Sequence, residues 1–115
     1  MIEVWQIMLN DDLVDAINEH GWNYNEKSQT YARVIMGYEF SNWKNDMARH
    51  YTKVYEVMAD TLEEAFSLTN VWNDESRVKR IEQGTSGSVG NLFMKFDGAN
   101  RRMFFCDNFG FTEIL

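Results

Sequence analysis

The sequence predicts an α+β protein: a single small domain with a mainly antiparallel β-sheet, including a C-terminal hairpin, packed against two or more short helices. Three observations predict this class. The chain has 115 residues, which is the usual size of one domain. Its hydrophobic fraction of 44% and aromatic fraction of 15% supply enough apolar mass to close a core. Two amphipathic segments follow helix-capping residues, and two apolar segments flank a turn sequence near the C-terminus.

The first elements follow one another closely. The apolar, β-branched run at residues 2–9 predicts a buried strand. A helix is expected at 11–20, because Asn10 and the two aspartates after it supply N-cap chemistry and apolar residues then recur three and four apart. Gly21 is the expected stop of this helix.

The central region, residues 22–50, has the weakest pattern. Residues 22–30 are mostly polar and aperiodic, which predicts a loop, and residues 31–36 are ambiguous between strand and helix. Ser41 is a candidate cap for a short helix in which Trp43 and Met47, four residues apart, share a face.

Clearer patterns return after residue 50. Residues 51–58 have the composition of a strand. Asp60 and Glu63 resemble a capping box, with an acceptor at the cap and a carboxylate three residues later, so a helix is expected over 61–70. Asn70 is its expected end, because asparagine tolerates the left-handed conformation.

The C-terminal part predicts a β-hairpin. Residues 91–96 and 101–106 are apolar runs on either side of Asp-Gly-Ala-Asn at 97–100, a strong hairpin signal. A short strand-like tail follows at 111–115.

Strand parity divides the hairpin side chains between two faces. The expected core face carries Leu92, Met94, Phe96, Met103 and Phe105. The opposite face carries Phe93, Lys95, Arg102, Phe104 and Cys106. Because binding surfaces are enriched in aromatic residues and arginine, we predict an interaction surface made of Phe93, Arg102, Phe104, Phe109 and Phe111. The competing interpretation is that a helix, the segment 22–50 or a second copy of the chain covers this face.

The glycine-rich stretch at 84–90 follows a highly charged segment, 73–84, that predicts a short exposed helix or turn. The stretch superficially resembles a phosphate-binding loop. It lacks the lysine of such loops, and a strand is expected after it where phosphate binding needs the start of a helix. A flexible turn is the favoured interpretation.

No pattern in the sequence indicates an enzyme, a metal site or a cofactor. Cys106 with His20 or His50 is the only thiol and imidazole combination, and its setting between phenylalanines and an aspartate favours a buried structural cysteine. The two histidines and the cysteine have no metal-binding spacing. A single cysteine allows no internal disulfide, and no signal-peptide pattern or membrane-length apolar run is present, so a cytoplasmic protein without membrane contact is expected.

The charge distribution is acidic and uneven. The formal net charge is −7, and residues 1–75 hold fourteen Asp and Glu against five Lys and Arg. An acidic surface argues against nucleic-acid binding, which needs clustered cations, and suits solubility or docking to a basic partner. An inhibitor that mimics DNA with an array of carboxylates is a further alternative.

Residues 51–115 resemble the YodL-like family and related small proteins of tailed phages, particularly those of marine cyanobacteria. Three pieces carry the resemblance: Ala-Asp-Thr-Leu-Glu-Glu-Ala-Phe at 59–66, Ser-Gly-Ser-Val-Gly-Asn at 86–91 and Asp-Asn-Phe-Gly-Phe at 107–111. The chain departs from the family pattern at Asn91, where the family usually has aspartate. The resemblance implies a small α+β module in a phage or bacterial setting, without a defined activity, cofactor or substrate.

Together these observations predict a non-enzymatic protein-interaction module. The expected setting is the host cytoplasm, where a phage-type accessory protein binds a host or phage protein or associates with itself. The alternatives are a binder of a small molecule or nucleotide, and the acidic DNA mimic.

Overall fold

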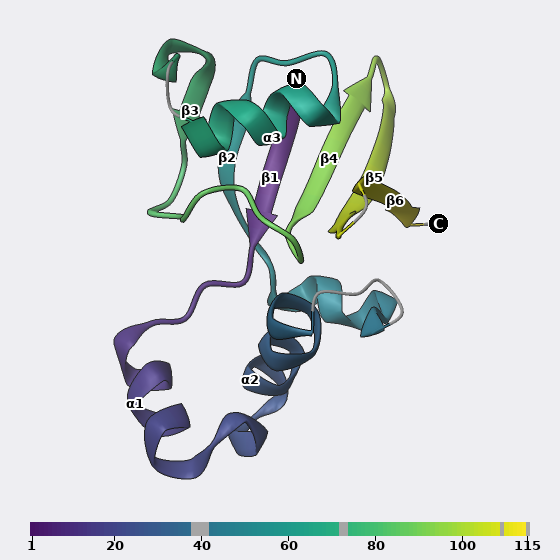
Figure 1. Ribbon diagram of the computed structural model, residues 1–115. Coiled ribbons are helices and arrows are strands. Elements are labelled where there is room, and N and C mark those ends of the chain that lie inside the picture. The colour runs from purple at the N-terminus through teal and green to yellow at the C-terminus, as the bar shows by residue number, and fades with distance from the viewer. Residues whose placement is uncertain (38–41, 72–73, 109, 115) are drawn as a thin grey trace.

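The computed structural model in Figure 1 describes residues 1–37, 42–71, 74–108 and 110–114. These residues form a six-stranded sheet with one helix across a face and a group of further helices beyond one end. The predicted α+β class, with a mainly antiparallel sheet and a C-terminal hairpin, is confirmed.

Every neighbouring pair of strands is antiparallel, in the order β3-β2-β1-β4-β5-β6. The strands are β1 (Ile2–Gln6), β2 (Thr52–Val57), β3 (Val78–Arg80), β4 (Leu92–Asp97), β5 (Asn100–Asp107) and β6 (Gly110–Ile114). Five of them were expected from the sequence. The pairing of Asp97 with Asn100 leaves a two-residue turn between β4 and β5.

The strand β3 was not expected. The charged segment 73–84 contains a 3₁₀ turn at Glu75–Arg77, as its composition suggested, but the chain then pairs with β2 along Val78–Arg80. This strand is short, charged and at the sheet edge, so it carries no apolar alternation from which a strand could be predicted.

The helix α1 (Asp11–His20) forms as predicted. Asn10 is the N-cap, and its Oδ1 accepts a hydrogen bond of 2.8 Å from the Leu13 amide. Gly21 ends the helix and donates its amide to the carbonyl of Ile17.

The helix α3 (Leu62–Val71) lies within one residue of its predicted bounds, but its cap differs. The Glu64 amide donates to Thr61 Oγ1 at 3.1 Å, so Thr61 and not Asp60 caps the first turn. Asn70 lies inside the last turn, where its Nδ2 donates to the carbonyls of Phe66 and Gly87. The asparagine therefore ties the helix to the glycine-rich loop.

The predicted loop at 22–30 is wrong. A 3₁₀ turn at Trp22–Tyr24 leads into α2 (Glu26–Tyr31), which starts with a reciprocal capping box between Asn25 and Ser28. The side chains that α2 buries are polar, so the helix has no apolar stripe to reveal it.

Most of the other described residues of the central region are also helical. A π-helical turn at Ala32–Met36 follows α2, and a 3₁₀ helix spans Asn45–His50. Trp43 and Met47 pack into the same cluster, as their spacing suggested. The predicted cap Ser41 lies outside the described residues.

Two hydrophobic clusters lie on opposite faces of the sheet. The α3-side cluster joins the sheet to α3 and contains Ile2, Val4, Val54, Tyr55, Val57, Ala59, Ala65, Leu68, Phe93 and Cys106. The second cluster joins the sheet to the helical lobe, defined as residues 11–37 and 42–50, which lies below the sheet in Figure 1. This lobe-side cluster contains Ile7, Val34, Met47, Tyr51, Leu92 and Phe105. Among the described residues, no helix is both long enough and apolar enough to cross a membrane.

Candidate functional site

The structure confirms the parity of the hairpin but not the exposure of its second face. Phe93 pairs with Phe104 across β4 and β5, and Leu92 pairs with Phe105, so each pair shares a face as predicted. Both faces are buried: Phe93 and Phe105 are each 0% exposed. The competing interpretation therefore holds, because α3 covers one face while the helical lobe covers the other.

The aromatic centre of the predicted interaction surface is a core cluster. The ring of Phe93 lies 5.0 Å from that of Phe111 and 6.3 Å from that of Phe66 on α3, measured between centroids. Phe104 is 9% exposed. Phe93 and Phe104 are therefore core residues and not part of an exposed interaction surface, because their rings are already buried within the chain.

The other members of the predicted surface lie toward the edge of the sheet. Arg102 is exposed, and its guanidinium lies 5.2 Å from the ring centroid of Phe104. The guanidinium also donates hydrogen bonds to both carboxylate oxygens of Glu113 on β6, at 2.7 and 3.0 Å. The ion pair raises the pKa of Arg102 and lowers that of Glu113. Phe111 is half-buried, and Phe109 lies outside the described residues.

A cleft opens beside Phe111, where α3 meets the corner between β5 and β6. This corner cleft has a volume of about 270 Å³ and is lined by Glu63, Phe66, Val89, Cys106, Asp107, Asn108, Gly110 and Phe111. In Figure 1, α3 crosses in front of β1 and β2 and leaves β5 and β6 free at its side. The charged residues of the lining are Glu63 and Asp107, both acidic.

Cys106 lies in the wall of this cleft as a buried thiol. It is 4% exposed, and burial, reinforced by Asp107, raises its pKa to about 12. A thiol with this pKa stays protonated at neutral pH and is a poor nucleophile. The histidines make other contacts: His50 accepts a hydrogen bond from Arg49, and His20 stacks on Tyr24.

Most backbone amides of the glycine-rich loop at 84–91 donate to other groups of the chain. Thr85 donates its amide to Gln6, Ser88 donates to Asn91, and Gly90 donates to the carbonyl of Cys106. A phosphate-binding loop needs its amides free to cradle an anion, and these are occupied. The loop acts as a scaffold in this fold.

Asn91 fixes that loop through its side-chain oxygen. Oδ1 accepts from the Ser88 amide at 2.9 Å and from Gln6 Nε2 at 3.1 Å, and the residue is 3% exposed. Both contacts use the oxygen as an acceptor, a role that an aspartate oxygen also fills. The departure from the expected aspartate therefore keeps the acceptor chemistry of the position.

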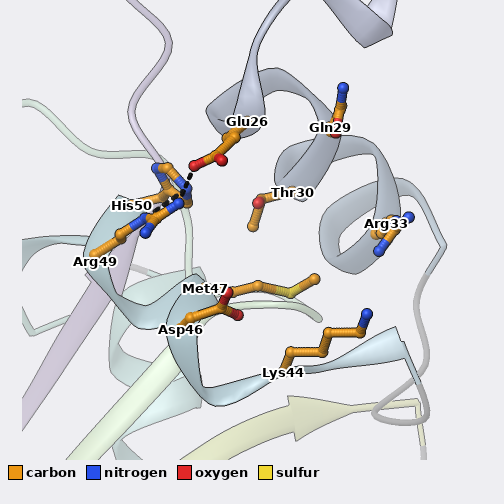
Figure 2. Close-up of a pocket in the computed structure, with 9 residues that line it drawn as sticks. All are labelled: Glu26, Gln29, Thr30, Arg33, Lys44, Asp46, Met47, Arg49 and His50. Atoms are coloured by element: carbon orange, nitrogen blue, oxygen red, sulfur yellow. Dashed lines mark hydrogen bonds and ion pairs between the residues drawn. The ribbon is translucent and has the colours of Figure 1, made fainter.

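A second, charged cleft lies within the helical lobe, between α2 with its π-helical extension and the 3₁₀ helix (Figure 2). It has a volume of about 160 Å³, and its lining is Glu26, Gln29, Thr30, Arg33, Lys44, Asp46, Met47, Arg49 and His50. Arg49 forms an ion pair with Glu26 at one end of this charged cleft. Within the described residues, neither Arg33 nor Lys44 forms an ion pair.

The charged cleft was not found from the sequence, although a signal was present. Four of the five Lys and Arg residues within 1–75 fall in the short segment 26–50. Their sequence spacing has no helical or metal-binding period, so only the fold shows that three of them, Arg33, Lys44 and Arg49, line one cleft. Among the described residues, no group of three or more His, Cys, Asp or Glu could hold a metal ion.

No protein-family model matches the chain, and comparisons with curated proteins and with solved structures found no significant match.

Proposed function

We propose that this chain is a non-enzymatic protein-interaction module that binds an extended, basic segment of a partner protein in the corner cleft. In keeping with the resemblance of residues 51–115, the proposed setting is a phage-type accessory protein acting on a host or phage protein in the host cytoplasm. The observation that carries the proposal is the combination of apolar walls and an acidic rim in one open cleft.

The walls suit an apolar anchor. Phe66, Val89 and Phe111 offer partly exposed apolar surface backed by the α3-side cluster, so the site is supported by packed side chains. Burying one aliphatic or aromatic side chain there contributes about 1.5–3 kcal/mol. Interfaces commonly depend on a few such anchors in well-packed pockets.

The acidic residues at the rim of the corner cleft favour a positively charged residue of the partner. Glu63 and Asp107 form no ion pair with any described residue, so both carboxylates are available to lysine or arginine beside the anchor. The net charge of −7 favours the approach of a basic partner over the whole surface.

The sheet edge next to the cleft suits an extended segment. Gly110 and Phe111 line the cleft and also begin β6, which pairs only with β5 among the described strands. A partner strand added to the outer edge of β6 gains main-chain hydrogen bonds while its anchor fills the cleft. This arrangement combines sequence-independent affinity with a preference for apolar and basic residues.

A selection from a random peptide library against the intact chain tests the proposal. The expected consensus is an apolar residue flanked by lysine or arginine. The double variant Glu63→Lys/Asp107→Lys should weaken the selected peptides by about tenfold or more at low salt, since both rim charges are reversed. Fluorescence anisotropy of labelled peptides provides the measurement.

The matched control is Asp15→Lys/Glu19→Lys, an equal change of charge on the exposed face of α1. It should alter binding by much less than the rim variant. Peptides with no basic preference, or equal losses in the rim and control variants, would remove the corner cleft as the binding site. Affinity capture from infected or parent-type cells, with the rim variant as the comparison, then identifies the partner.

A further inference from the structure

The charged cleft of the helical lobe holds two cations that form no ion pair with any described residue. The chain has 18 acidic against 11 basic Lys and Arg residues, so carboxylates are abundant. Arg33 and Lys44 nevertheless form no ion pair with a described residue, whereas Arg49 in the same cleft pairs with Glu26. Figure 2 shows the Arg33 and Lys44 side chains together at the end of the cleft away from that pair.

A hydroxyl group lies in the wall of the same cleft, between the Glu26–Arg49 pair and the two cations in the view of Figure 2. Thr30 is 5% exposed, and its side chain makes no hydrogen bond within the described part of the chain. Every fully buried side-chain oxygen and nitrogen described has a partner, so the Thr30 hydroxyl retains access to the cleft that it lines. It is a free donor facing the same space as the two cations (Figure 2).

Cationic side chains outnumber carboxylates in the lining of the cleft. The lining carries Arg33, Lys44 and Arg49 against Glu26 and Asp46. The pKa of His50 is lowered, by burial first and then by the charges of Arg49 and Lys27, against an opposing effect of Asp46. The cationic effect thus exceeds the carboxylate effect at this wall, although the surrounding chain is acidic.

From these features we infer that the charged cleft binds a phosphate group, through the Arg33 guanidinium, the Lys44 ammonium and the Thr30 hydroxyl. Donors from three separate positions suit a tetrahedral anion with several acceptor oxygens better than a planar carboxylate, which one arginine alone can hold in a bidentate pair. The volume of about 160 Å³ fits a small group and not a nucleotide. Inorganic phosphate and a small phosphate monoester share this chemistry.

Titration of the ¹⁵N-labelled chain followed by NMR tests the inference. Inorganic phosphate, glycerol phosphate and acetate are added separately, against sodium chloride at matched ionic strength. Saturable shifts centred on Thr30, Arg33 and Lys44 are expected with a phosphate probe. Tighter binding of inorganic phosphate identifies the free anion as the ligand, and tighter binding of glycerol phosphate identifies a monoester.

Variants assign the donors. Arg33→Met/Lys44→Met removes two exposed charges and should weaken phosphate binding by about tenfold or more. Thr30→Val should weaken it, and Thr30→Ser should restore it, because serine retains the donor. The control Lys79→Met changes an exposed lysine on β3, at the far end of the molecule (Figure 1), and should leave binding unchanged.

Three results would overturn the inference: no saturable shift with either phosphate probe, equal affinity for acetate, or full affinity in the Arg33→Met/Lys44→Met variant. Thermal unfolding of each variant in the absence of phosphate confirms that the fold is retained. The peptide-binding proposal concerns the corner cleft, so failure of either proposal leaves the other intact.

Discussion

At the scale of single residues, buried amide side chains hold the glycine-rich loop against the sheet. Gln6 accepts from the Thr85 amide and donates to the Thr85 and Ser86 carbonyls, while its Nε2 also donates to Asn91. The side chains of Gln6 and Asn91 are each 3% exposed, so removing one leaves the other short of a partner in a medium of low polarity. The loop at 84–91 is therefore fixed by Gln6 on β1 and by its own last residue, Asn91.

The variant Asn91→Ala measures this dependence. It removes the acceptor of the Ser88 amide and one acceptor of Gln6, so we expect the free energy of unfolding to fall by about 1–3 kcal/mol. Urea unfolding followed by circular dichroism gives the value. The control Asn18→Ala removes an exposed amide from α1 and should stay within about 0.5 kcal/mol of the original chain. Equal effects would contradict the role of Asn91.

At the scale of elements, the sequence predicted those helices and strands whose cap, turn or apolar pattern lies within the segment itself. The helix α1 has its cap and its apolar stripe in sequence, and the hairpin has its turn between two apolar runs. By contrast, α2 depends on a capping box and buries the polar Ser28, so periodicity does not detect it. The strand β3 forms because it pairs with β2, and the sequence of β3 alone contains no pattern that predicts this contact.

The loop and the helical lobe meet at a close backbone contact. Gly90 has a φ of 92°, and a Cβ there would lie 2.5 Å from the carbonyl oxygen of Val34. A backbone oxygen in a π-helical turn cannot yield as a flexible side chain can. The position therefore requires glycine for its conformation and for the space.

The pair Gly90→Ala and Gly98→Ala separates these two requirements. Gly98, in the hairpin turn, also has a positive φ, of 62°, but a Cβ there meets nothing within 4 Å. We expect Gly98→Ala to cost about 1–2 kcal/mol from conformation alone. Gly90→Ala should cost at least about 1 kcal/mol more, because the lobe must shift. Similar losses in urea unfolding would mean that the contact with Val34 is unimportant.

At the scale of the whole molecule, both faces of one sheet are covered. Phe93 points into the α3-side cluster and Phe105 into the lobe-side cluster, although they lie on adjacent strands. Parity in the sequence separates these faces but does not say which of them remains exposed; that depends on where α3 and the lobe pack. The position of the corner cleft follows from the same packing, because the cleft opens where α3 no longer covers the sheet.

Because the same strands contribute to both clusters, we expect the sheet and the lobe to unfold as one cooperative unit. β1 contributes Ile2 and Val4 to the α3-side cluster and Trp5 to the border of the lobe-side cluster. Of the tryptophans that the structure describes, Trp22 and Trp43 lie in the lobe and Trp5 borders the lobe-side cluster, so their fluorescence reports on the lobe in a Trp72→Phe background. Far-ultraviolet circular dichroism reports on all helices and strands. The two signals should give the same midpoint in urea.

The variant Phe93→Leu makes this expectation sharper, because it changes only the α3-side cluster. Replacing the ring with a smaller apolar side chain should cost about 1 kcal/mol. No tryptophan is among the described residues of that cluster. If the two layers are coupled through the shared strands, the fluorescence midpoint falls as far as the midpoint from circular dichroism. A fluorescence midpoint that stays in place while the other falls would show that the helical lobe unfolds independently of the α3 layer.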